Sequence, residues 1–214
     1  MRMGIAFAAA LGVGLAASAA AQSGASWASG DGGLTTLMLS GSGNEPPPAP
    51  QPLTAGEMAQ LFKRVCLDTA GHPAAIAAAI AEGKLELTPT PAVLAATKKQ
   101  PEVTLGVWRG PGMVAAQTSG FRVVPEGQCN ITFYPAELPD RAVLAEALSA
   151  LVGSAPENAA EAVKKNGEPN KRFAPRWSLA RAEGAPLRVN AIVMRGHQYM
   201  PGDRVLVALT GISQ

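Results

Sequence analysis

Histidine and cysteine are scarce in this chain, with two of each among 214 residues. The histidines, His72 and His197, do not lie in the H-E-x-x-H or H-x-x-E-H spacing of a zinc site. A metal site built from His72, His197 and Asp203 stays open as an alternative, but ordinary loop histidines are the simpler interpretation. We therefore expect no metal ion and no cofactor.

The common nucleophile and phosphate-binding motifs are also missing. No serine lies in a G-x-S-x-G turn, which excludes that hydrolase signature. The absence of C-x-x-C excludes a thioredoxin-type redox motif. The glycine-rich strings GSGN and SGDGG do not follow an expected strand, so they do not predict phosphate loops. No catalytic residue is predicted from these patterns.

Long apolar runs are lacking, and the one near the start is too short for a convincing membrane span. Residues 1–21 combine the basic Arg2, an apolar run from residue 4 to about 17, and alanines at 19–21. This pattern predicts a signal peptide cleaved before Gln22, with a retained membrane anchor as the alternative. No cysteine precedes Cys66, so the cleavage site is not that of a lipoprotein. We expect a periplasmic or secreted protein without stable membrane insertion.

Charge is low and unevenly distributed. After removal of residues 1–21 the chain has 17 basic and 16 acidic side chains, a net charge of +1, which argues against nucleic-acid binding. Residues 22–163 carry 8 basic and 13 acidic side chains, whereas residues 164–214 carry 9 basic and 3 acidic ones. The first part is therefore net acidic and the second net basic. Such an uneven distribution indicates either an interaction surface or two oppositely charged parts of one fold that attract each other.

Residues 22–53 have the composition of a disordered arm. They are rich in glycine and serine and then in proline, as in QSGASWASGDGG and GSGNEPPPAPQP. A spacer is the simpler interpretation, and a ligand for an aromatic groove is the alternative. We expect residues 54–214 to form a single domain.

Three helices are expected in this domain. Thr54 and Glu57 predict a capping box, and the apolar residues after it, including Cys66, recur at helical spacing until Gly71. Pro73 opens a second helix that ends at Gly83, and a helical turn is expected at 92–97. The third is the apolar helix at 141–153.

Alternating segments predict strands between and after these helices. They lie at 103–109, 113–118, 129–134, 172–181, 187–195 and 204–212, and 121–124 is a further short candidate. This order of elements predicts an α+β fold, with an antiparallel sheet of about five to six strands and three helices packed on it.

The two cysteines of an exported chain predict a disulfide between Cys66 and Cys129. Both are expected to point inward, Cys66 from a helix stripe and Cys129 from the apolar face of a strand. The alternative is a nucleophilic Cys66 with His72 or His197 as its base. Its position in the last turns of a helix disfavours a thiolate, because the helix dipole is negative there.

The basic C-terminal part contains the candidate binding residues. Arg172, Arg176 and Arg188 are expected to line one face of the sheet, and Tyr199 and Met200 lie in a loop beside it. These residue types are common at interfaces. The plain alternative is that the charges only keep the outer side of the sheet in water.

The string F-x-x-V-C-L-D-T-x-G at residues 62–71, Trp108–Arg109 and a second cysteine at the start of a strand resemble a group of small exported proteins of alphaproteobacteria. The resemblance implies an envelope location and brings no activity or catalytic residue with it. His72 departs from it, because an acidic residue is expected at that position.

Together these patterns predict an exported, non-enzymatic binding domain of the cell envelope whose partner is an envelope protein. A hydrolase with a site assembled from distant residues and a binder of anionic ligands through the arginines are the alternatives.

Overall fold

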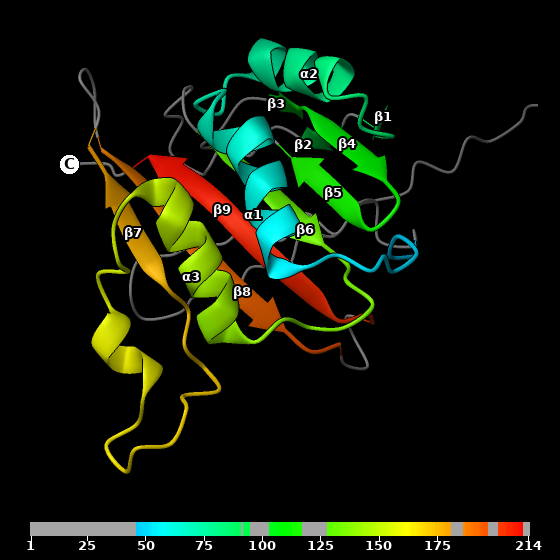
Figure 1. Ribbon diagram of the computed structural model, residues 1–214. Coiled ribbons are helices and arrows are strands. Elements are labelled where there is room, and N and C mark those ends of the chain that lie inside the picture. The colour runs from blue at the N-terminus through cyan, green and yellow to red at the C-terminus, as the bar shows by residue number, and fades with distance from the viewer. Residues whose placement is uncertain are drawn as a thin grey trace, which may run out of the picture.

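The computed structural model describes residues 46–90, 92–94, 103–116, 128–180, 186–196 and 201–211 (Figure 1). The predicted signal peptide at 1–21 and the arm up to residue 45 lie outside the described residues, as does the predicted strand at 121–124.

The described chain forms a seven-stranded antiparallel sheet in the order β1-β4-β5-β6-β9-β8-β7, and a separate pair, β2-β3. The strands are β1 (Thr88–Pro89), β2 (Ala92–Leu94), β3 (Val103–Leu105), β4 (Val107–Gly110), β5 (Met113–Ala116), β6 (Cys129–Phe133), β7 (Arg176–Leu179), β8 (Leu187–Met194) and β9 (Arg204–Gly211). The antiparallel α+β architecture is confirmed. The predicted number of strands in the sheet, five to six, is too low.

The additional strand is β1, at the edge of the sheet. It has two residues, and Thr88 and Pro89 lie opposite Arg109 and Trp108 of β4. A two-residue segment has no alternation to detect, and proline is tolerated in sheets mainly on an edge strand. From the sequence alone, residues 88–89 therefore look like part of a connection and not like a strand.

Two other expectations fail near β1. The helical turn expected at 92–97 is wrong, because β2 occupies 92–94 and pairs with β3. The strand expected at 103–109 is divided at Gly106 into β3 and β4. A Cβ at Gly106 would lie 2.6 Å from the indole ring of Trp108, so the ring occupies the space of a side chain.

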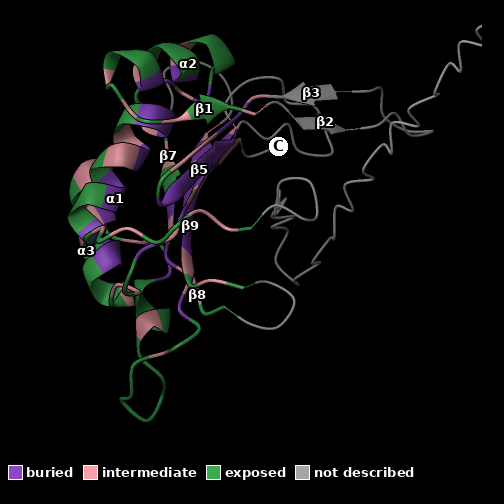
Figure 2. Ribbon diagram, turned by 90° about the vertical axis from the view of Figure 1, so that its right-hand side faces the viewer, coloured by how far each residue is buried: buried purple, intermediate pink, exposed green. Residues whose placement is uncertain are grey.

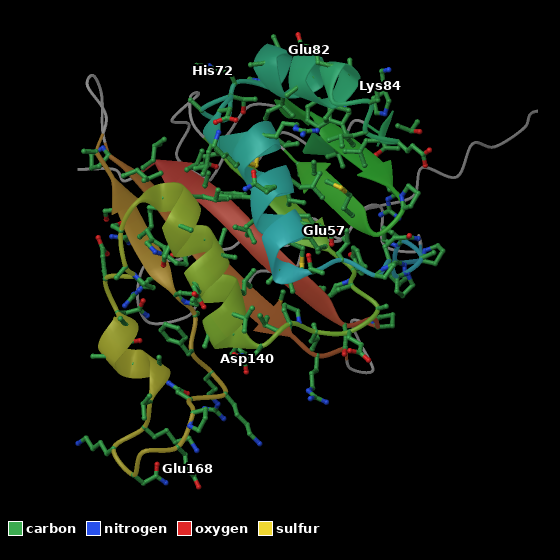
Figure 3. The ribbon with its side chains drawn as sticks, viewed as in Figure 1. Glu57, His72, Glu82, Lys84, Asp140 and Glu168 are labelled. Atoms are coloured by element: carbon green, nitrogen blue, oxygen red, sulfur yellow. A yellow bond between two sulfur atoms is a disulfide. The ribbon has the colours of Figure 1, made fainter. Side chains whose placement is uncertain are left out.

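Three α-helices, as predicted, are found in the described part: α1 (Ala55–Phe62), α2 (Pro73–Glu82) and α3 (Arg141–Val152). The capping box predicted at the start of α1 is present, with Glu57 and Thr54 bonded reciprocally. Asp140 caps α3 through the backbone N–H of Ala142, at 2.7 Å. Figure 3 labels Glu57 and Asp140 at these two helix starts.

The first helical segment changes its hydrogen-bonding pattern before it ends. After Phe62 the chain continues as a π-helical turn, Lys63–Leu67, which contains Cys66. The segment ends at Gly71, whose φ of 75° is in the left-handed region that suits glycine. His72 then takes the N-cap position of α2 without a capping hydrogen bond from its side chain.

The helices lie together on one side of the sheet, as Figure 2 shows. Alternate strand residues point toward them and are buried with Phe62, Leu144 and Leu148 in one apolar core. Trp177 of β7 is fully buried in this core, and its indole N–H donates to Ser149 Oγ of α3 at 3.2 Å. The apolar faces of the helices and of the sheet therefore cover each other.

The disulfide joins α1's π-helical extension to the sheet. Cys66 and Cys129 are bonded, their Cα atoms are 5.4 Å apart, and both residues are buried. The predicted disulfide is therefore confirmed. It connects segments 63 residues apart in the sequence.

Ordered contacts begin before Thr54, the predicted start of the domain. Gln51 N–H donates to Tyr134 O at 3.0 Å, and its carbonyl accepts from Ala136 N–H at 2.7 Å. Gly112 N–H donates to Ala49 O at 3.1 Å. The end of the proline-rich segment is thus hydrogen-bonded to the chain that follows β6 and to the turn between β4 and β5.

Candidate functional site

The cysteines and histidines do not form a reactive centre in the described residues. The sulfur of Cys66 is bonded to that of Cys129, so the alternative of a nucleophilic Cys66 is wrong. His72 is exposed at the start of α2, and His197 lies outside the described residues. No group of three or more His, Cys, Asp or Glu side chains in the part of the chain that the structure describes is arranged to hold a metal ion.

The side of the sheet away from the helices carries polar and charged residues, unlike the apolar side that packs on the helices. Strand residues alternate between the two faces, and directly paired residues of antiparallel strands share a face. We call the residues opposite to the core-facing ones the outer face. It consists of Thr88, Val107, Arg109, Val114, Ala116, Asn130, Thr132, Arg176, Ser178, Arg188, Asn190, Ile192, Met194, Arg204, Leu206, Ala208 and Thr210.

All the charged residues on the described strands are arginines, and all of them belong to the outer face. They are Arg109 of β4, Arg176 of β7, Arg188 of β8 and Arg204 of β9. Like charges spread over one face repel each other unless counter-charges are near. The described strands contribute no acidic residue that would balance these four guanidinium groups.

One row of the outer face has two asparagines, one on either side of an alanine of β9. Asn130 of β6 and Asn190 of β8 each lie opposite Ala208 of β9, and Arg176 lies opposite Asn190 on the other side. Asparagine is disfavoured in strands, and a buried amide costs free energy unless it is hydrogen-bonded. In this row, Asn190 is the residue whose amide has no hydrogen-bond partner.

Several polar atoms of this face are buried without a hydrogen-bond partner. They are Oδ1 and Nδ2 of Asn190, Nε of Arg188, and Nε and Nη2 of Arg204. Asn190 is only 3% exposed, so bulk water does not replace a partner for its amide. Buried polar groups in native proteins are nearly always paired, so these atoms are exceptions.

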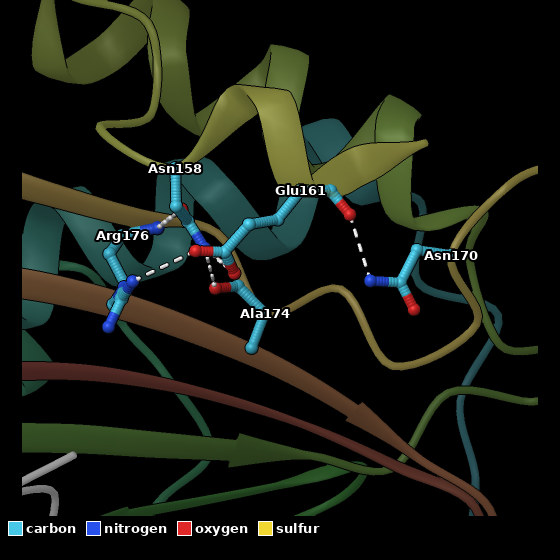
Figure 4. A network of polar contacts seen from close by, with 5 residues as sticks. All are labelled: Asn158, Glu161, Asn170, Ala174 and Arg176. Carbon is cyan, nitrogen blue, oxygen red and sulfur yellow. Dashed lines mark hydrogen bonds and ion pairs between the residues drawn. The ribbon is translucent and has the colours of Figure 1, made fainter. Parts of the chain in front are cut away.

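Arg176 is partly neutralised from the edge of the sheet. Its Nη2 lies 3.3 Å from Oε1 of Glu161, in a 3₁₀-helix (Ala159–Ala162). Figure 4 shows how Asn158 completes this network, with its Oδ1 accepting from the backbone N–H of Arg176 and its Nδ2 donating to Ala174 O. The connection before β7 is thus tied to the edge strand.

Arg141 is a basic residue with a structural role. From the start of α3 it donates to Phe173 O at 2.8 Å and to Val193 O at 2.6 Å. Its partial burial lowers the pKa of the guanidinium from the ordinary arginine value. Since two carbonyls occupy this group, it is not a candidate for ligand binding.

The predicted binding residues are placed as follows. Arg176 and Arg188 lie on one face, in adjacent strands. Arg172 is not on the sheet but in an exposed turn, because β7 begins four residues later. A side-chain turn at Asn170, whose Oδ1 accepts from Arg172 N–H, delays the strand. Tyr199 and Met200 lie outside the described residues.

Sequence reasoning missed Arg109, Arg204 and Asn190 as members of the same face. A signal for them was present, because each is a polar residue next to an apolar core position in its strand. Knowing that these strands are neighbours requires the strand order, which the sequence pattern does not contain.

No helix among the described residues is long and apolar enough to cross a membrane. Comparison of the chain with protein-family models, with curated proteins and with solved structures gives no match. The geometry of the outer face is therefore the basis for assigning a function.

Proposed function

We propose that this chain is an exported, non-enzymatic binding domain of the cell envelope, and that its outer face binds an anionic partner. The observation that carries this proposal is the placement of Arg109, Arg176, Arg188 and Arg204 on one face, with no acidic residue on the described strands. Guanidinium groups recognise carboxylates and phosphates by paired hydrogen bonds, which suits this face to oxyanions.

An envelope location agrees with the disulfide. Disulfides persist in oxidising compartments such as the periplasm and are rare in the cytosol. The signal-peptide pattern in residues 1–21 supports the same compartment. Mass spectrometry of the full chain expressed in a Gram-negative host should find protein that begins at Gln22 in the periplasmic fraction. Intact Met1 in a membrane fraction would contradict this part of the proposal.

The binding face is tested by charge reversal. Wild type, Arg188→Glu and Arg204→Glu are compared for binding to poly-L-aspartate, polyphosphate and phosphatidylglycerol vesicles. Lys165→Glu is the matched control, because it makes the same charge change in an exposed turn away from the strands. Wild type should bind at least one of these anions, more weakly as salt is added. Both face variants should bind about tenfold more weakly than Lys165→Glu.

Two results would overturn the proposal. One is a wild-type protein that binds none of the three anions at low salt. The other is equal binding by Arg188→Glu, Arg204→Glu and Lys165→Glu, since the net charge alone would then explain the attraction.

A further inference from the structure

The proline-rich segment enters the domain beside the outer face. Pro46, the first residue that the structure describes, accepts a hydrogen bond at its carbonyl from Arg109 Nη1, at 3.0 Å. Arg109 belongs to the outer face. Ala49 O then accepts from the backbone N–H of Gly112, at 3.1 Å, in the turn between β4 and β5. The arm, residues 22–45, is therefore tethered at the β4 side of the outer face.

A row of outer-face residues leads from this tether across the sheet. Arg109 is paired with Val114, and the row continues through Thr132, Leu206 and Ile192 on β6, β9 and β8. Val114 and Leu206 are only 7% and 5% exposed, although the helices lie on the other side of the sheet (Figure 2). The row is therefore covered within the free chain by a segment other than the three helices.

The composition of the arm is complementary to the outer face. Residues 22–45 contain Asp31 and Glu45 and no basic residue, whereas the charged residues of the described strands are four arginines. Opposite charges attract each other, and more strongly where water is displaced. Residues 34–39, with the sequence LTTLML, are the most apolar part of the arm and are stabilised when apolar surface covers them. Charge and apolar character both favour contact with the outer face.

The length of the arm matches the width of the row. Neighbouring strands are about 4.8 Å apart, so the steps from Arg109 on β4 to Ile192 on β8 cover about 19 Å. Leu37 lies nine residues before Pro46 in the sequence. A glycine-rich chain of that length has an average span of about 15–18 Å and reaches about 30 Å when it is extended. The leucines of the arm can therefore lie over the far end of the row.

We propose that residues 34–39 lie across the row from Arg109 to Ile192 and act as an autoinhibitory strap, which an anionic partner must displace from the outer face. This inference rests on the proposed function, because it names the regulation of the same face. The strap is joined to the domain through Pro46, so it competes at the high effective concentration of a tethered ligand. A weak intrinsic contact is therefore sufficient to keep the face occupied.

The position of the strap is tested by disulfide trapping in the full chain. Leu37→Cys is combined with Ile192→Cys or, as the matched control, with Val143→Cys, which is exposed on α3 at the opposite side of the sheet. Cross-linked peptides are quantified by mass spectrometry under non-reducing conditions, which also checks the bond between Cys66 and Cys129.

The Leu37–Ile192 pair should cross-link about tenfold faster than the Leu37–Val143 pair, because only the first pair is held together by the strap. If Ile192→Cys does not fold, Met194→Cys, the next outer-face residue on β8, replaces it. Equal rates for the two pairs would show that another part of the chain covers the row, and the inference would be overturned.

The inhibitory role is tested with the arm variant Leu37→Ser/Leu39→Ser, which leaves the net charge unchanged. Binding to poly-L-aspartate, polyphosphate and phosphatidylglycerol vesicles is compared with that of wild type at low salt. The variant should bind about tenfold more tightly, which is the change expected when the strap leaves the face open about one tenth of the time. Thr35→Ser/Thr36→Ser, which alters the same stretch and keeps its leucines, is the control and should bind like wild type.

Failure of this inference differs from failure of the proposed function. If wild type binds an anion and Leu37→Ser/Leu39→Ser binds it equally well, the face binds anions but the strap does not inhibit it, and the inference is wrong. If neither protein binds any of the three anions, the proposed function is wrong and the inhibitory role fails with it, whatever the cross-linking shows.

Discussion

Asn130 and Asn190 lie in one row of the outer face, each directly opposite Ala208 of the strand between them. The same three strands present only apolar residues toward the helices, such as Ile131, Val207 and Ala191. The centre of the sheet therefore has one apolar side and one side on which polar and apolar residues are mixed. Of these two amides, that of Asn190 is buried without a hydrogen-bond partner, which costs free energy.

The disulfide is expected to stabilise the domain strongly. It closes a loop whose ends are 63 residues apart, so the double variant Cys66→Ala/Cys129→Ala should lose roughly 4 kcal/mol of unfolding free energy in the chain-entropy model. Urea unfolding followed by tryptophan fluorescence measures the loss. Wild type reduced under denaturing conditions and refolded with reductant is the control and should match the variant. A loss below about 1 kcal/mol would show that the disulfide does little for stability.

Arg141 is expected to be the basic residue most important for folding. Arg141→Ala removes the donors for Phe173 O and Val193 O, so it should lower the unfolding free energy by roughly 2–4 kcal/mol. Arg141→Lys should lose less, because a lysine ammonium can still serve one carbonyl. Arg172→Ala, in an exposed turn, is the control and should change stability by less than about 0.5 kcal/mol. Equal stability of Arg141→Ala and Arg172→Ala would contradict the structural role.

The capping box of α1 is expected to make stability depend on pH in the acid range. Hydrogen bonds from the backbone N–H of Thr54, at 2.8 Å, and from its hydroxyl, at 2.7 Å, hold the pKa of Glu57 below its ordinary value of 4.5. A carboxyl with a lowered folded-state pKa stabilises the fold above its unfolded pKa. This stabilisation is lost as the pH falls through the folded value.

Wild type should therefore melt at a higher temperature than Glu57→Gln at pH 7, and the difference should shrink as the pH falls below about 4.5. Thermal scans by circular dichroism at several pH values measure it. In a Thr54→Ala background, which removes the hydroxyl donor, the difference at pH 7 should be smaller. A difference that stays constant from pH 7 to pH 3 would contradict the assignment.

Much of the fold was predictable because it depends on local patterns. The Thr54–Glu57 capping box, the stop at Gly71 and the helix over residues 141–152 follow from helix-end chemistry and apolar spacing. The disulfide was predictable because only two cysteines are present. By contrast, β1 and β2 were missed, since segments of two and three residues carry no periodicity.

Of the four arginines on the outer face, two were predicted from the sequence and two were not. Arg176 and Arg188 were identified from alternation within their strands, but Arg172 was included because the strand was expected to start too early. Arg109 and Arg204 come from strands more than ninety positions apart in the chain. Only the strand order β4-β5-β6-β9 brings these two strands into one sheet.

The sequence by itself determined the three helices, the longer strands and their inward faces, because helix caps, alternation and apolar spacing act over a few residues. Only the tertiary structure decided that the four strand arginines share one face and that Asn190 has no partner there. Strand order and register are settled by packing of the whole core, which brings together residues that no local pattern connects.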